Sequence, residues 1–118
     1  MYFISHRGNI ENKIEELENS PLYIDNALEL GYDVEIDLWK IDSELFLGHD
    51  EPTYSIELDW LIERKERLWV HCKNIESLIH LTSNKIDLNY FWHDQDFATL
   101  TSKNFIWAKE NKKLIEIG

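Results

Sequence analysis

Three short motifs carry residue types that serve phosphate chemistry. His6-Arg7-Gly8 follows an apolar start, Glu35-Ile36-Asp37 lies within an apolar stretch, and His49-Asp50 comes shortly after it. Each motif is common on its own, so their order and spacing are more informative than any single residue. Together they supply the histidines, the arginine and the paired carboxylates of a metal-assisted site for a phosphate ester.

The two carboxylates are spaced to act together. Residues two apart in a β-strand point to the same face, so Glu35 and Asp37 would present their oxygens side by side. Such oxygens are the ligands that Mg²⁺ and Ca²⁺ prefer, and the planar guanidinium of Arg7 suits phosphate oxygens. Cleavage of a phosphodiester also needs one group that accepts a proton and another that returns one, and histidine suits both tasks.

Short strands alternate with helices along the chain. Ser20 and Pro21 mark a helix start, with the hydroxyl as a cap, and Gly31 marks the end of that helix. This alternation predicts parallel β-α units. The predicted strands are 2–6, 33–41, 45–47, 68–72, 90–93, 105–108 and 114–117, and the helices are 21–30, 56–65 and 75–81, with 97–100 as a short helix or turn.

Polar residues recur where the predicted strands end. Besides the three motifs, these residues are His71, Lys73, His93 and Asp94. In barrels of β-α units the active site lies at that end of the strands, so we expect these side chains to meet. By the same alternation Cys72 points to the opposite face, as a small core residue.

Residues 4 to 50 resemble the glycerophosphodiester phosphodiesterase family, within the phosphatidylinositol-phospholipase-C-like superfamily. The shared run is His6-Arg7-Gly8, Glu18-Asn19, an apolar helix ending at Gly31, Glu35-Ile36-Asp37 and His49-Asp50, in that order. The resemblance implies a phosphoric diester hydrolase with a TIM-type (β/α) barrel. It implies that His6 and His49 are the acid and base, in an order left open, that Arg7 binds the phosphate, and that Glu35 and Asp37 bind a metal.

The chain departs from the family pattern after residue 50. Where the family has Glu-x-Lys, with the glutamate as a third metal ligand, this sequence reads His71-Cys72-Lys73. Lys73 is expected near the phosphate. The third ligand is then His71, Asp94 or water. A histidine is a softer ligand than a carboxylate and would favour a metal other than Ca²⁺. The expected cofactor is Mg²⁺ or Ca²⁺, with Mn²⁺ as a further candidate.

The length of 118 residues is short for an eight-unit barrel, which takes about 250. We therefore expect one domain, residues 1–118, that forms an incomplete barrel of about five or six units, as a short or truncated member. Two copies could complete each other as a homodimer, because open sheet edges invite pairing. Two other interpretations stay open: an inactive partial barrel that binds a metal or partner, and a zinc-type metallohydrolase that uses His71 and His93.

Composition limits the classes of partner and the location that the protein can have. The net charge of −11 argues against binding to nucleic acid, which needs basic patches. No apolar run approaches the roughly 20 residues of a membrane span, and the start lacks the features of a signal peptide. Cys72 is the single cysteine, so no internal disulfide can form. These observations favour a cytoplasmic protein, and the family resemblance implies a small phosphodiester as its substrate.

Overall fold

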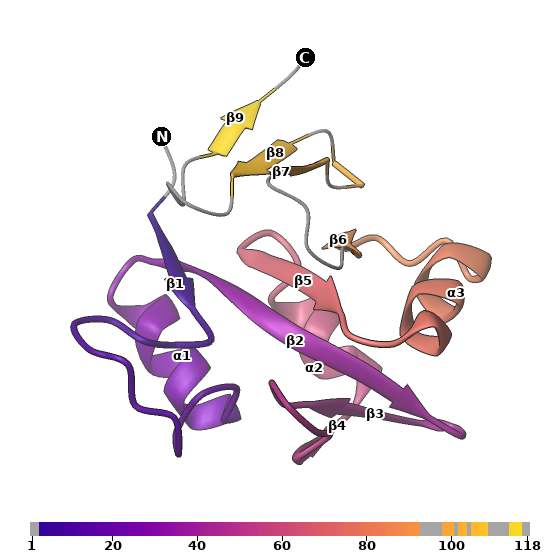
Figure 1. Ribbon diagram of the computed structural model, residues 1–118, viewed down its shortest axis with the longest axis horizontal. Coiled ribbons are helices and arrows are strands. Elements are labelled where there is room, and N and C mark those ends of the chain that lie inside the picture. Colours follow the sequence, from indigo (N-terminus) through magenta and orange to yellow (C-terminus); the bar gives the residue numbers. More distant parts are fainter. Residues whose placement is uncertain (1–2, 93–97, 101, 104, 109–113, 117–118) are drawn as a thin grey trace.

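The computed structural model describes residues 3–92, 98–100, 102–103, 105–108 and 114–116. Within them a six-stranded mixed sheet and a small three-stranded antiparallel sheet form an α/β fold (Figure 1). The strands of the main sheet are β1 (Ile4–His6), β2 (Asp33–Ile41), β3 (Glu44–Leu47), β4 (Tyr54–Ile56), β5 (Leu68–Cys72) and β6 (Asn89–Phe91). The helices are α1 (Pro21–Glu29), α2 (Leu58–Glu63) and α3 (Ile75–Ser83), and the small sheet contains β7 (Ala98–Leu100), β8 (Phe105–Ala108) and β9 (Leu114–Glu116).

Strand β2 is the centre of the main sheet, and two strands share one of its edges. It pairs in parallel with β1 at its start and antiparallel with β3 at its end. Its other edge pairs in parallel with β5, which in turn pairs with β6. The parallel strands β1, β2, β5 and β6 therefore lie side by side in chain order, while the β3–β4 hairpin extends the sheet from the end of β2, on the same edge as β1 (Figure 1).

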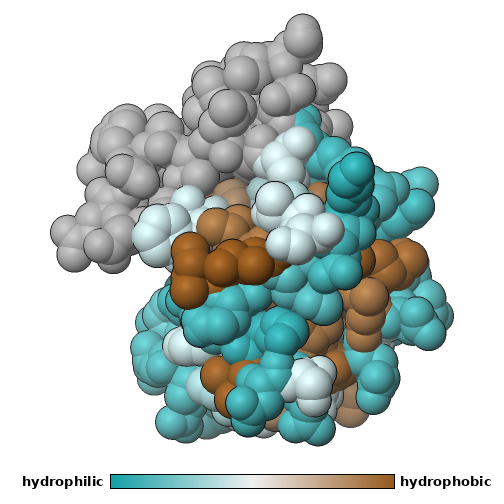
Figure 2. All heavy atoms as spheres, turned by 90° about the vertical axis from the view of Figure 1, so that its right-hand side faces the viewer, coloured by the Kyte–Doolittle hydropathy of each residue, from teal (hydrophilic) through white to brown (hydrophobic). Residues whose placement is uncertain are grey.

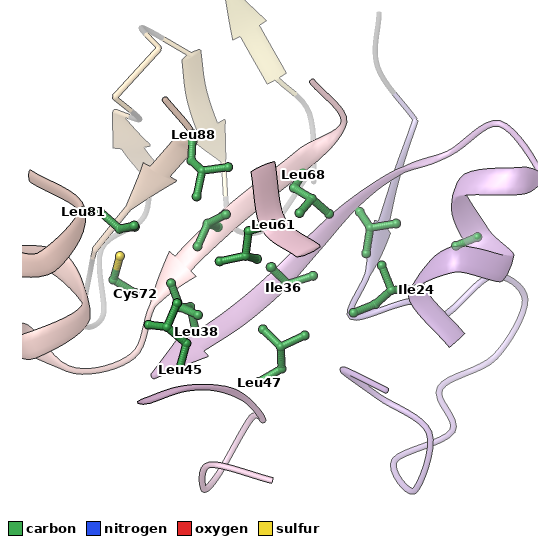
Figure 3. Packing of buried hydrophobic residues seen from close by; sticks show 13 residues of the cluster. Ile24, Ile36, Leu38, Leu45, Leu47, Leu61, Leu68, Cys72, Leu81 and Leu88 are labelled. Atoms are coloured by element: carbon green, nitrogen blue, oxygen red, sulfur yellow. The ribbon is translucent and has the colours of Figure 1, made fainter. Parts of the chain in front are cut away.

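The two faces of the sheet differ in chemistry. Val34, Ile36 and Leu38 of β2 are fully buried against side chains of all three helices, among them Ile24 of α1 and Leu61 of α2 (Figure 3). The alternate residues of β2 and β5 point to the other face, which carries the candidate site. A smaller apolar cluster of Trp69 and Phe91 with Ile4 lies on that second face. The helices pack against the first face, and the polar side chains of β2, Glu35 and Asp37, are buried on the second.

Local signals explain the helix ends. Pro21 occupies the first turn of α1 as predicted, but the Ser20 side chain makes no capping hydrogen bond, so its predicted capping role is wrong. Gly31 has a φ of 97°, which glycine adopts without strain. Asn74 caps α3 by accepting a hydrogen bond from the Ser77 N–H, and it also bonds both backbone groups of Lys40 at the end of β2. Its amide thus ties α3 to the sheet.

The predicted elements are largely confirmed, with three differences. The segment 54–56 forms β4, and the following helix begins at Leu58 rather than at residue 56. Residues 98–100 form a strand rather than a helix or turn. The main sheet is open and its described strands do not close into a barrel. In the order β4-β3-β2-β5-β6, the edge strands β4 and β6 each pair with one strand only. The predictions for His93, Asp94 and residue 97 lie outside the described residues.

The surface on the side of α3 is mainly hydrophilic, with hydrophobic side chains between the polar ones (Figure 2). Ile75 and Ile79, one turn apart on α3, are about half exposed. In the described part of the chain, no helix combines the length and the apolar character that crossing a bilayer requires.

Candidate metal and catalytic site

The sequence motifs meet on the face of the sheet opposite the helices. His6 ends β1, Glu35 and Asp37 lie in the parallel part of β2, and His71 is the penultimate residue of β5. The strand register places His6 opposite Glu35, and Asp37 opposite His71. His49 reaches the same place from the turn after β3. Four of the predicted site residues therefore owe their positions to strand pairing.

Glu35, Asp37 and His71 form a buried group with one ligand atom each within 4.8 Å of the others. The Nδ1 atom of His71 lies 3.2 Å from Oδ1 of Asp37 and 3.8 Å from Oε2 of Glu35. Its ring stacks on that of Phe91 at a centroid distance of 5.1 Å and an interplanar angle of 8°. This stacking and the strand pairing together hold the imidazole nitrogen toward the two carboxylates.

Two further histidines lie close to the carboxylates. Nε2 of His6 lies 3.3 Å from Oε1 of Glu35, and Nδ1 of His49 lies 3.5 Å from Oδ2 of Asp37. The His6 and His49 side chains are 36% and 39% exposed, so both stay accessible from solvent. This combination of a buried carboxylate group with accessible imidazoles suits proton transfer to a bound molecule.

The turn that carries His49 is held tightly. Trp39, on the same strand face as the carboxylates, donates its indole N–H to the carbonyl of Gly48 at 2.6 Å. The Gly48 N–H in turn donates to the carbonyl of Asp37. A Cβ at Gly48 would lie 1.9 Å from the carbonyl oxygen of Glu51, so only glycine fits there. Trp39 therefore anchors the His49 turn to β2.

Arg7 takes part in a network of the loop after β1. Its Nε lies 3.0 Å from Oδ2 of Asp37, and its Nη1 donates to Oε1 of Glu18 at 3.2 Å. Asn9 donates to the other oxygen of Glu18 and to the carbonyl of His6. Glu18 is therefore a buried carboxylate with partners on both oxygens. Arg7 still has N–H groups beyond the two that these carboxylates use.

Asn19 clamps Asp37 from both sides. The Asn19 side chain is fully buried, and its Nδ2 donates to Oδ2 of Asp37 at 3.0 Å. Its Oδ1 accepts the backbone N–H of Asp37 at 2.9 Å. The Asn19 backbone has a φ of 67°, a left-handed conformation that asparagine tolerates better than most residues. With Arg7 on the same oxygen, this clamp directs the remaining oxygen, Oδ1, toward His71.

Replacing Asn19 by alanine is expected to lower both stability and metal affinity. The change leaves the buried Asp37 without two partners, which costs about 2–4 kcal/mol of unfolding free energy. Metal affinity should fall roughly 10- to 100-fold, as for other residues that orient a ligand. Urea unfolding and calorimetric metal titration would measure the two effects. Asn19→Gly, which suits the positive φ, should be as harmful if the amide is responsible, and exposed Asn12→Ala is the control.

Burial and charge set the protonation of the two carboxylates. Burial raises the pKa of Glu35 well above its ordinary value, and neighbouring Asp37 raises it further, against the opposing charges of Arg7 and Lys73. Burial would also raise the pKa of Asp37. The imidazoles of His49 and His71, the Asn19 amide and the Arg7 charge outweigh it and hold that pKa far below its usual range. Asp37 is therefore the permanent anion of the pair.

The residues present fit a divalent cation. Oε1 of Glu35 and Oδ1 of Asp37 are buried, and among the described residues neither accepts a well-formed hydrogen bond. Imidazole nitrogens approach these two oxygens, at 3.3 Å and 3.2 Å, and buried carboxylate oxygens that lack a well-formed hydrogen bond are costly unless another ligand occupies them. A pocket of about 460 Å³ opens beside the site, with His6, Arg7, Glu18 and His49 in its wall. A small charged ligand can thus approach the accessible histidines.

Several of the predicted site residues lie close together in the structure. The structure brings His6, Arg7, Glu35, Asp37, His49 and His71 together, and Lys73 follows directly after β5, close enough to influence Glu35 electrostatically. Asp94 lies outside the described residues. Cys72 is fully buried on the helix-facing side as predicted, and burial raises the pKa of its thiol to about 12.

Sequence reasoning gave no role to Glu18 or Asn9, nor to the side chain of Asn19. The Glu18-Asn19 pair stands out as a motif, but its partners are 11 and 18 residues away in the chain. Asparagine before a helix start is a usable signal for a left-handed residue, although it does not reveal which group the amide would bind.

Comparison with protein-family models, curated proteins and solved structures finds no match to this chain.

Proposed function

We propose that this protein is a divalent-metal-dependent phosphodiesterase that hydrolyses a glycerophosphodiester or a similar small phosphodiester. The observation that carries this proposal is the buried group of Glu35, Asp37 and His71 with accessible His6 and His49 beside it. Two buried carboxylates with oxygens that accept no well-formed hydrogen bond suit a cation, and the two accessible imidazoles suit acid and base catalysis.

The arrangement of the sheet supports kinship with (β/α) barrels. Strands β1, β2, β5 and β6 are parallel and adjacent in chain order, and the helices pack on one face. This is the order of consecutive units in a TIM-type barrel, whose inner face carries the site near the carboxyl ends of the strands. We interpret the open sheet as part of such a barrel and the chain as a member of the glycerophosphodiester phosphodiesterase family. A second copy that pairs with an open edge would extend it.

Each residue of the site would have its own role in hydrolysis. Glu35, Asp37 and His71 would hold the divalent ion, which would offset the negative charge of the phosphodiester. Arg7 and Lys73 would bind phosphate oxygens. One of His6 and His49 would accept the proton of the attacking water as its oxygen bonds to phosphorus. The other would give a proton to the departing alkoxide as its bond to phosphorus breaks.

The second candidate is a binding module without turnover. The observation that favours it is the engagement of Arg7 by Asp37 and Glu18, which draws this cation toward carboxylates rather than toward a phosphate. Such a module would still bind a metal through Glu35 and Asp37. A zinc-type hydrolase using His71 and His93 is a related alternative, and His93 lies outside the described residues.

Turnover assays separate these candidates. Purified protein would be incubated with glycerophosphocholine and with an aryl phosphodiester, each with Mg²⁺, Ca²⁺ or Mn²⁺ and with a chelator. We expect hydrolysis that requires metal and is abolished by the chelator. A folded, metal-binding protein that hydrolyses neither substrate under any of these ions would favour the binding module.

A further inference from the structure

The oxygen atoms free to bind a cation at this site are few. Oδ2 of Asp37 already receives hydrogen bonds or charge contacts from Asn19 and Arg7, each at 3.0 Å. Both oxygens of Glu18, the next buried carboxylate, are held by Arg7 and Asn9. In the part of the chain that the structure describes, this leaves Oδ1 of Asp37 and the oxygens of Glu35, which are approached by imidazole nitrogens of His71 and His6.

Hard cations prefer a coordination shell made of oxygen atoms. Ca²⁺ takes six to eight oxygen ligands, and Mg²⁺ prefers octahedral oxygen coordination. The third ligand here is instead an imidazole nitrogen, because His71 is fixed by its stacking on Phe91 with Nδ1 toward both carboxylates. One imidazole nitrogen and two carboxylates are a ligand set typical of divalent transition metals.

We propose that His71 makes this a site for divalent transition-metal ions of the Mn²⁺ to Zn²⁺ series rather than for Mg²⁺ or Ca²⁺. This inference rests on the metal site of the proposed function and specifies its ion. His71 is the residue that determines the selectivity, and a carboxylate in its place would return the preference to hard cations.

Substitutions at His71 test this directly, because aspartate places an oxygen where Nδ1 lies. Calorimetric titration of chelator-treated wild-type protein should show Zn²⁺ and Mn²⁺ binding more than about tenfold tighter than Mg²⁺ and Ca²⁺. His71→Asp should weaken Zn²⁺ binding roughly 10- to 100-fold and strengthen Mg²⁺ or Ca²⁺ binding. Asparagine has the shape of aspartate but no charge. His71→Asn should therefore weaken Zn²⁺ binding without strengthening Mg²⁺ or Ca²⁺ binding.

Matched variants locate the binding. His71→Phe retains an aromatic ring for Phe91 and removes the nitrogen, so its thermal unfolding separates loss of folding from loss of a ligand. His80→Gln removes a histidine from α3 and should leave Zn²⁺ affinity unchanged, whereas Asp37→Asn should abolish it. If the variants unfold, the ¹⁵N shift of the His71 ring on Zn²⁺ addition to wild-type protein gives an independent answer.

Any of three results would overturn the selectivity inference. They are equal affinity of wild-type protein for Mg²⁺ and Zn²⁺, an unchanged ion preference in His71→Asp, and a ¹⁵N shift of the His71 ring that does not change when Zn²⁺ is added. None of these results would prevent metal-dependent hydrolysis. Conversely, tight Zn²⁺ binding through His71 without hydrolysis of any phosphodiester would refute the proposed function and leave the inference intact.

Discussion

His6→Ala should lower phosphodiester turnover by about 10²- to 10⁴-fold, the usual contribution of one general acid or base. The side chain is about one-third exposed, and its Nε2 lies 3.3 Å from Oε1 of Glu35. The backbone pairing of β1 with β2 does not depend on the imidazole. The loss should therefore fall on catalysis, while unfolding free energy and metal affinity change by less than about 1 kcal/mol.

Three measurements on one preparation test this prediction: turnover at saturating metal, thermal unfolding, and calorimetric metal titration. His80→Ala is the matched control, because it deletes an imidazole on α3 outside the site and should retain full turnover. If His6→Ala unfolds or loses metal binding in parallel with turnover, the residue is structural and its catalytic assignment is wrong.

Periodicity explains why much of the fold was predictable. Alternation along β2 placed Val34, Ile36 and Leu38 on the buried face and the carboxylates on the other, and the structure confirms this. Local turn chemistry placed the end of α1 at Gly31. Such signals arise within a few residues, so a single sequence contains them.

Contacts between distant segments were not predictable in the same way. The pairing of Asp37 with His71 depends on the register of β2 against β5, 34 residues later, which periodicity does not specify. The Asn19 clamp depends on the path of a loop. The extent of barrel closure also depends on which strands find neighbours, and in the described sheet β4 and β6 remain at the edges.

Short, weakly patterned segments account for the errors in secondary structure. The segment 54–56 has only three residues in a strand, and its pairing with β3 defines it. Ile56 fits a helical apolar pattern equally well, which moved the predicted helix start two residues too early. For such segments tertiary pairing overrides local preference.

Glu35→Gln should have opposite effects on the metal-free and the metal-bound protein. Burial and the adjacent Asp37 make an ionised Glu35 costly without a cation. Glutamine is neutral, has nearly the same shape, and can donate to Asp37 as a protonated glutamate would. We expect the metal-free variant to be more stable by on the order of 1 kcal/mol, or roughly 4 °C in Tm. The same change should remove most of the stabilisation on metal addition, because it deletes a ligand.

The pH dependence gives this prediction its sign. A carboxyl whose pKa is raised by folding carries no penalty below its unfolded pKa, near 4.5 for glutamate. The penalty grows as pH rises from there toward the raised folded pKa, since the fold must then accept the charge. Metal-free wild-type protein and Glu35→Gln should therefore have similar Tm values near pH 4, and the Tm of the variant should exceed that of wild type increasingly as pH rises.

Thermal melts with chelator from pH 4 to 8 would measure this difference in Tm, with exposed Glu15→Gln as the control. A variant less stable than wild type at every pH would mean that ionised Glu35 stabilises the metal-free fold, and the cation would then not be needed to neutralise it.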